Sequence, residues 1–183
     1  MKKLYSIIAM IFMAIAATTM VGCDEDANIA YTLEGVWEGN MYKQSYYNGR
    51  YFQSSYTVMQ FDRDPYRYSS GTGKWIDYYS NAPWDYFASY ISWTVDNGRI
   101  RIYSEKENQT YYIDDFRISD NYFEGYICDR YNNEKSFSMR NIDSPNWNRY
   151  DWNGYYYDDY YYAPAARSAK QKPEVPTASI KAD

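Results

Sequence analysis

The alternation of side chains over residues 87–102 is the feature that most constrains the fold. Every second residue from Phe87 to Val95 fits one buried face, and the pattern resumes after Asn97-Gly98 and continues to Ile102. Side chains alternate between the two faces of a strand, so this period of two predicts half-buried strands. Asn-Gly is a preferred pair for a type I′ turn. The segment therefore predicts a β-hairpin.

Comparable patterns extend over residues 33–141 and predict no helix after the N-terminal signal-like segment. We predict eight antiparallel strands at residues 36–43, 51–62, 71–79, 87–95, 100–102, 110–118, 121–128 and 134–141. Leu33 is the last leucine in the chain, and the abundant Tyr, Trp, Ile, Thr and Val suit strands. Closure hides the apolar face and removes the sheet edges. We expect an all-β fold, a single eight-stranded up-and-down barrel.

Gly35-Val36-Trp37, on the first predicted strand, resembles the G-x-W signature of lipocalin-like proteins. In that family the tryptophan plugs the closed end of the barrel, and an arginine near the last strand lies across its ring. The resemblance implies that Trp37 is this plug and that Arg140 supplies the cation. It covers residues 33–141 and is closest to the small lipocalin-like domains of bacterial surface lipoproteins. An ordinary core aromatic is the alternative for Trp37.

The first 23 residues carry the pattern of an exported, lipid-modified protein. Two lysines precede an uncharged run over residues 4–17, which has the length of a secretory h-region and is too short to span a membrane. Met20-Val21-Gly22-Cys23 then resembles the bacterial lipobox. The resemblance implies a lipoprotein signal peptide over residues 1–22 and attachment of lipid, including palmitate, at Cys23. The alternative is an ordinary secretory signal with an unmodified cysteine.

Three acidic residues, Asp24-Glu25-Asp26, follow this cysteine and bear on where the protein is located in the cell envelope. In several Gram-negative groups such residues resemble a signal for the outer face of the outer membrane, whereas in enterobacterial-type cells an aspartate directly after the cysteine, here Asp24, resembles an inner-membrane retention signal. A solvated linker without an address is the third interpretation. We expect residues 23–32 to form an acidic tether, with the mature protein lipid-anchored at the outer membrane and exposed at the cell surface.

The composition changes after residue 141. Residues 142–162 form an extension rich in Tyr, Trp and Asp, and residues 163–183, which lack aromatic side chains, are predicted to be disordered. The extension has three interpretations: it covers apolar surface of the barrel, it forms an adhesive surface, or it binds calcium. The candidate binding residues are Trp147, Trp152, Tyr156 and Tyr160, and the candidate calcium ligands are Asp151, Asn153, Asp158 and Asp159.

The residue types present limit the chemistry of the chain. It contains no histidine, which removes the commonest general base and the usual ligands of zinc and haem. The net charge of −5 disfavours nucleic acid as a partner. If Cys23 is acylated, Cys128 has no partner for an intrachain disulfide. We expect no catalytic residue, no cofactor and no bound metal.

These features predict a non-enzymatic binding or accessory module of the bacterial cell envelope, held at the membrane by its lipid. Its expected partners are a glycan, a small hydrophobic ligand or an envelope protein. The alternative is a structural subunit that docks to another envelope protein through the tyrosine-rich extension, and a hydrolase with two converging carboxylates is a third. An internal polar pocket would favour the first, and a filled aromatic core would favour the second.

Overall fold

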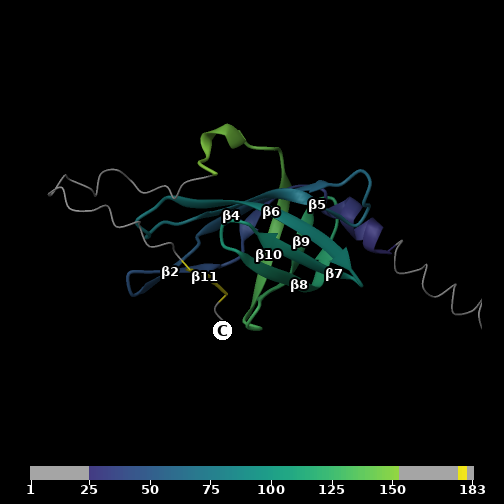
Figure 1. Cartoon of the computed structure of the whole chain (residues 1–183). Helices are drawn as coiled ribbons and strands as arrows, with labels where there is room; N and C mark the ends of the chain where they lie inside the picture. The colour runs from purple at the N-terminus through teal and green to yellow at the C-terminus, as the bar shows by residue number, and fades with distance from the viewer. Residues whose placement is uncertain (1–24, 153–176, 181–183) are drawn as a thin grey trace, which may run out of the picture.

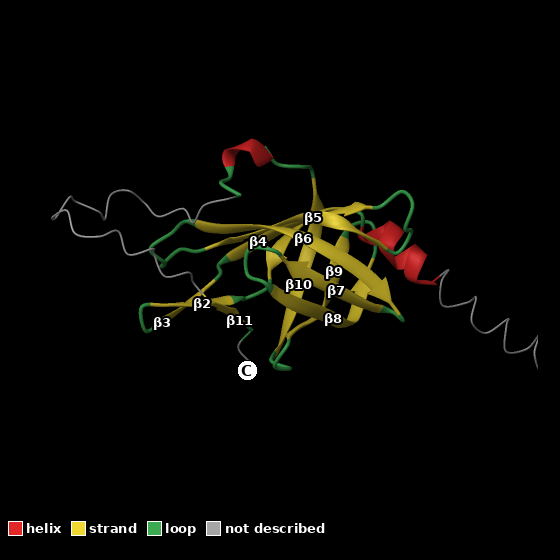
Figure 2. Cartoon of the chain, in the orientation of Figure 1, coloured by secondary structure: helices red, strands yellow, loops and turns green. Residues whose placement is uncertain are grey.

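The computed structural model describes residues 25–152 and 177–180 of the 183-residue chain. Eight strands follow one another around a closed antiparallel barrel, and β1 completes the circle by pairing with both β4 and β10 (Figures 1 and 2). The strands are β1 (Gly35–Asn40), β4 (Tyr56–Arg63), β5 (Ser70–Tyr78), β6 (Tyr86–Asp96), β7 (Arg99–Ser104), β8 (Gln109–Ile118), β9 (Tyr122–Asp129) and β10 (Glu134–Ile142). The predicted eight-stranded up-and-down barrel is confirmed.

A small hairpin interrupts the barrel between β1 and β4. The strand predicted over residues 51–62 is divided into β3 (Arg50–Gln53) and β4, and β2 (Gln44–Tyr47) pairs with β3 outside the barrel. Asn48 and Gly49 connect the two short strands with φ angles of 47° and 76°, as a type I′ turn requires. The hairpin therefore lies where the sequence places an Asn-Gly turn.

Part of the tail predicted to be disordered is a strand. β11 (Thr177–Ser179) pairs with β2, which gives a three-stranded sheet in the order β11-β2-β3. Ile180 follows it and is buried in the core of the barrel, where its amide donates a hydrogen bond to Asp129 at 3.3 Å. Local composition missed this segment because β2 and the barrel, which are distant in sequence, supply its partners.

A helix over residues 25–33 replaces the tether expected there (Figure 2). The amides of Asn97 and Gly98 donate to the Asp26 carboxylate at 2.9 and 2.8 Å, so the helix is held against the turn between β6 and β7. Ala30 and Leu33 are fully buried in the barrel core. A helix this short is stabilised mainly by tertiary packing, and its sequence pattern is correspondingly weak.

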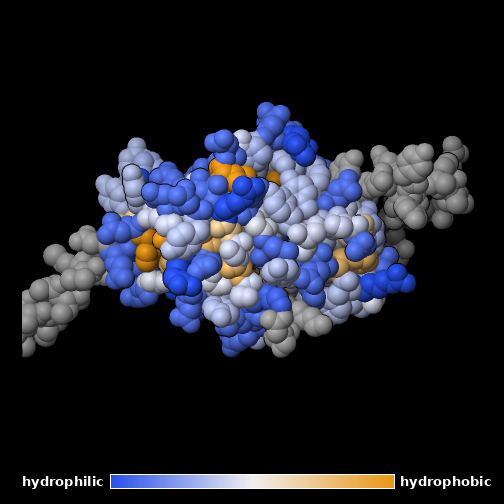
Figure 3. Space-filling model, turned by 180° about the vertical axis from the view of Figure 1, so that it is seen from behind, coloured by the Kyte–Doolittle hydropathy of each residue, from blue (hydrophilic) through white to orange (hydrophobic). Residues whose placement is uncertain are grey.

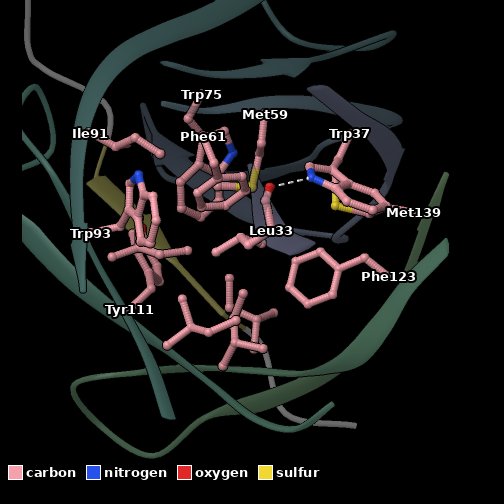
Figure 4. Packing of buried hydrophobic residues seen from close by; sticks show 14 of the residues in the cluster. Leu33, Trp37, Met59, Phe61, Trp75, Ile91, Trp93, Tyr111, Phe123 and Met139 are labelled. Atoms are coloured by element: carbon pink, nitrogen blue, oxygen red, sulfur yellow. Dashed lines mark hydrogen bonds between the residues drawn. The ribbon is translucent and has the colours of Figure 1, made fainter. Parts of the chain in front are cut away.

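Aromatic side chains fill the interior of the barrel (Figure 4). Their rings meet in edge-to-face or tilted pairs, with centroids 5.7 Å apart for Trp37 and Phe123 and 5.1 Å apart for Trp75 and Tyr111. Close packing also explains a glycine on β5. A Cβ at Gly71 would lie 1.9 Å from the Asp62 carbonyl oxygen, so no larger residue fits.

Trp37 lies in the interior next to the N-terminal helix. Its indole N–H donates a hydrogen bond to the Leu33 carbonyl at 2.8 Å, which ties the end of the helix to β1 (Figure 4). The implied contact with Arg140 is wrong. The alternation of β10 places Met139 inside and Arg140 outside, where it is 75% exposed and pairs with Glu38.

We expect Trp37→Ala to destabilise the protein by about 3–5 kcal/mol, because it opens a cavity and removes the bond to the helix. The matched change Arg140→Ala removes an exposed ion pair and should cost less than about 1 kcal/mol. Urea unfolding followed by circular dichroism measures both free energies. Equal losses of unfolding free energy in the two variants would contradict the assignment of Trp37 to the barrel end that the helix closes.

Candidate functional site

Both ends of the barrel are closed by segments that lie outside its eight strands. The N-terminal helix closes one end, and the β2–β3 hairpin with residues 177–180 lies at the other (Figure 1). Trp75, Trp93 and Phe137 fill the interior together with Trp37. This arrangement favours recognition on the outer surface over a ligand cup inside the barrel.

A buried charged cluster lies at the end near the hairpin. Lys43, which is 1% exposed, places its ammonium 2.6 Å from a carboxylate oxygen of Asp77 and 2.7 Å from one of Glu107. Burial lowers the pKa of Lys43, but the two carboxylates outweigh it and raise the pKa above its ordinary value. The same ammonium lies 4.2 Å from the centroid of the Trp75 ring.

Neutral donors complete the coordination of these two carboxylates. The Thr57 hydroxyl and the Trp75 indole N–H donate to Asp77 at 2.7 and 3.0 Å. The Tyr111 hydroxyl donates to Glu107 at 2.9 Å. Asp77 and Glu107 thus converge, as the hydrolase hypothesis requires, but their side chains are at most 2% exposed and share one lysine. Sequence reasoning missed this cluster because its members are far apart in the chain.

Tyr150, at the start of the tyrosine-rich extension, packs on the outer face of the barrel. Its hydroxyl is hydrogen-bonded to that of Tyr78, and its ring meets Tyr86 edge to face with centroids 5.3 Å apart. These rings cover Ile76 and Ala88, which point outward from β5 and β6 and are nevertheless fully buried. For this part of the extension, the interpretation as a cover for apolar surface is confirmed.

The two candidate tryptophans lie beside this contact and stay partly exposed. Trp147 belongs to the 3₁₀ helix η1 (Trp147–Arg149), with the Lys74 ammonium 5.0 Å from its ring centroid. Trp152 stacks on Tyr90 with centroids 5.0 Å apart and an angle of 27°. We call Trp147, Tyr150, Trp152, Tyr78, Tyr86 and Tyr90 the aromatic platform. It joins two of the predicted site residues in one place.

Several candidate residues lie outside the described part of the chain. These are Cys23, the predicted binding residues Tyr156 and Tyr160, and the calcium ligands Asn153, Asp158 and Asp159. Within residues 25–152 and 177–180, no three metal-ligating side chains are grouped together. No helix in those residues is long and apolar enough to cross a bilayer.

The face of the molecule seen from behind is mostly hydrophilic (Figure 3). Seen from behind, the barrel shows apolar residues in small separate areas between polar ones (Figure 3). Cys128 lies half-buried on the outside of β9, with its thiol 3.6 Å from Glu134. Burial, together with the Glu134 carboxylate, raises the pKa of the thiol to about 11. Cys128 is therefore a protonated, weakly reactive thiol at neutral pH.

Comparisons with models of protein families, with curated proteins and with solved structures found no match to this chain.

We expect Lys43→Met to destabilise the protein by about 3–5 kcal/mol, because it leaves two buried carboxylates without a cation. Breaking the exposed Arg117–Glu124 pair with Arg117→Met should cost less than about 1 kcal/mol. Denaturant unfolding measures both. The triple variant Lys43→Met, Asp77→Asn, Glu107→Gln should recover most of the loss, and a triple variant no better than the single one would contradict the charge argument.

We expect Cys128 to react with iodoacetamide at pH 8 on the order of 100-fold more slowly than an unperturbed thiol, because its thiolate is correspondingly scarce. Glu134→Gln should accelerate the reaction by less than about tenfold, since burial is the larger cause of the raised pKa. Mass spectrometry of the intact chain gives the rates, and Glu105→Gln is the control. A rate equal to that of a free thiol would contradict the raised pKa.

Proposed function

We propose that this protein is a lipid-anchored, non-enzymatic accessory module of a bacterial cell envelope. In this role the barrel is a solid scaffold, and partners bind to its outer surface. The observation that carries the proposal is the closed and filled barrel beside a partly exposed aromatic platform. The platform continues in sequence into Tyr155-Tyr156-Tyr157 and Tyr160-Tyr161-Tyr162.

The anchor in this proposal is Cys23, which follows the lipobox-like residues 20–22. The acidic residues after it support an address at the outer membrane, exposed at the cell surface. Asp26 also has a structural role, because its carboxylate binds the turn between β6 and β7. Asp24 and Glu25 are therefore the two acidic residues left for targeting.

Of the two forms of this role, docking to an envelope protein through the extension is the better supported. Trp147 and Trp152 present flat, partly exposed rings next to charged and hydroxyl groups, which is typical of binding surfaces. A small hydrophobic ligand would need interior volume that the core side chains occupy. A glycan bound on the rings remains the other partner that this surface suits.

A hydrolase is less well supported. Asp77 and Glu107 are the paired carboxylates that meet, and Lys43 neutralises part of their charge in an enclosed site. A saccharide would reach them only if the end of the barrel opened. Glycosidase carboxylates need access to the bond between two sugars.

The experiment that tests the proposal is gentle extraction of the full chain from Gram-negative membranes, followed by native mass spectrometry. We expect acyl mass on Cys23 and a retained envelope protein or glycan. Cys23→Ser should move the protein to the soluble fraction, whereas Cys128→Ser should leave it in the membrane. An unmodified Cys23 would refute the anchor.

The same measurement separates docking from the other roles. Trp147→Ser with Trp152→Ser should release the retained partner, whereas Tyr122→Ser with Tyr126→Ser, two exposed tyrosines of β9, should leave it bound. Circular dichroism confirms that both double variants are folded. Acylated protein that retains nothing would refute docking through the extension while leaving the anchor in place.

A further inference from the structure

We propose that the end of the barrel closed by the N-terminal helix lies on the bilayer surface. In this orientation Tyr31, Tyr66 and Tyr68 contact the lipid headgroups. We call these three residues the tyrosine face. The inference rests on the proposed anchor at Cys23 for the choice of this end, and it adds an orientation and a lipid-binding surface that the anchor alone does not imply.

The covalent position of Cys23 selects this end of the barrel. Cys23 is two residues before Glu25, and consecutive Cα atoms are 3.8 Å apart, so the two Cα atoms are within about 7.6 Å of each other. An extended ten-residue tether would have reached about 33 Å. The helix after Glu25 is fixed to the barrel by Asp26 and Leu33. An acyl group on Cys23 would therefore hold the helix end close to the membrane.

Large aromatic side chains are exposed at this same end. Tyr66 and Tyr68, in the loop between β4 and β5, are 90% and 64% exposed, and Tyr31 on the helix is 68% exposed. Arg63, the last residue of β4, places its guanidinium 5.2 Å from the Tyr31 ring centroid, so the strand that leads into this loop contacts the helix. The helix and this end of β4 lie at the same end of the barrel (Figure 1). Tyrosine rings favour the depth of lipid headgroups, because the ring is apolar and the hydroxyl is polar.

Two of the acidic groups on this surface, Glu34 and Asp64, are engaged by donors. Glu34 pairs with Arg63 at 3.2 Å. The amides of Tyr66 and Arg67 donate to Asp64 at 2.8 and 3.3 Å. Such partners reduce the repulsion between these carboxylates and lipid phosphates. The exposed Arg67 is then placed to attract a phosphate.

A cleft beside the tyrosine face gives phosphate a further set of donors. Its volume is about 570 Å³. Its lining combines Tyr66 with two arginines, Arg63 and Arg67, and with hydroxyl side chains such as Ser70 and Thr72. The carboxylates of Asp62 and Asp64 also line it, and both accept hydrogen bonds from neighbouring groups. A phospholipid headgroup, which carries a phosphate and sits at the depth of the tyrosines, fits this lining.

Exposure alone does not identify the face. Tyr51 and Tyr131, near the opposite end of the barrel, are 65% and 64% exposed. What distinguishes Tyr66 and Tyr68 is their position beside the helix that follows Cys23. The two pairs are exposed to a comparable degree but lie near opposite ends of the barrel, so Tyr51 and Tyr131 are matched internal controls.

The test compares tyrosine accessibility on and off a membrane. The acylated mature protein is reconstituted into phosphatidylcholine vesicles and iodinated with lactoperoxidase, an enzyme too large to enter the gap beneath the barrel. Peptide mass spectrometry gives the iodination of Tyr66 and Tyr68 relative to Tyr51 and Tyr131. We expect this ratio to fall by about fivefold or more relative to the soluble Cys23→Ser chain, because headgroups shield the tyrosine face.

The outcomes separate this inference from the anchor. Acyl mass on Cys23 with an unchanged ratio, or with protection of Tyr51 and Tyr131 instead, overturns the orientation and leaves the anchor intact. If Cys23 is unmodified, flotation of the Cys23→Ser chain with the same vesicles tests whether the tyrosine face binds lipid without an anchor. The inference is supported if this chain floats with the vesicles, if Tyr66→Ser with Tyr68→Ser weakens the flotation, and if Tyr51→Ser with Tyr131→Ser leaves it unchanged. A chain that does not float overturns the inference.

A protein partner on the same face gives a different result. If Tyr66 and Tyr68 contact a second copy of this chain, analytical ultracentrifugation of the Cys23→Ser chain without vesicles shows a dimer. Tyr66→Ser with Tyr68→Ser then makes it a monomer. That outcome overturns the membrane assignment.

Discussion

Closure of the barrel around an aromatic interior requires chain segments from outside the sheet. Eight strands form the wall, but a barrel has two ends through which water reaches the core. Ala30 and Leu33 of the helix close one end of the barrel. Ile180, near the C-terminal end of the sequence, enters the core at the other end. The structure therefore depends on two plugs that the strands themselves do not contain, and the sheet β11-β2-β3 positions the second of them.

The two ends of the interior differ in chemistry. Near the helix the inward positions are apolar or aromatic, whereas near the hairpin they include Thr57, Asp77 and Ser104. Lys43 enters that end and forms ion pairs with both Asp77 and Glu107, so these buried charges compensate one another. The interior is thus a filled core at both ends, which is why our proposal places recognition on the outer surface.

Two outer surfaces then have separate roles in our proposals. The tyrosine face is at the helix end, close to Cys23, and the aromatic platform lies on the side of the barrel over β5 and β6. A protein held by its end at a membrane keeps its side free. Anchoring and docking are therefore compatible in one small domain, since neither surface covers the other.

The sequence by itself determined the eight strands of the barrel wall and the Asn-Gly turns, because alternation and Asn-Gly chemistry act over a few neighbouring residues. It also pointed to Trp147 and Trp152 as aromatic surface residues. Only the tertiary structure decided that residues 25–33 are a helix and that residues 177–179 are a strand. The tertiary structure also brings Lys43 together with Asp77 and Glu107. Each of these depends on partners many residues away, and such contacts leave no local pattern to read.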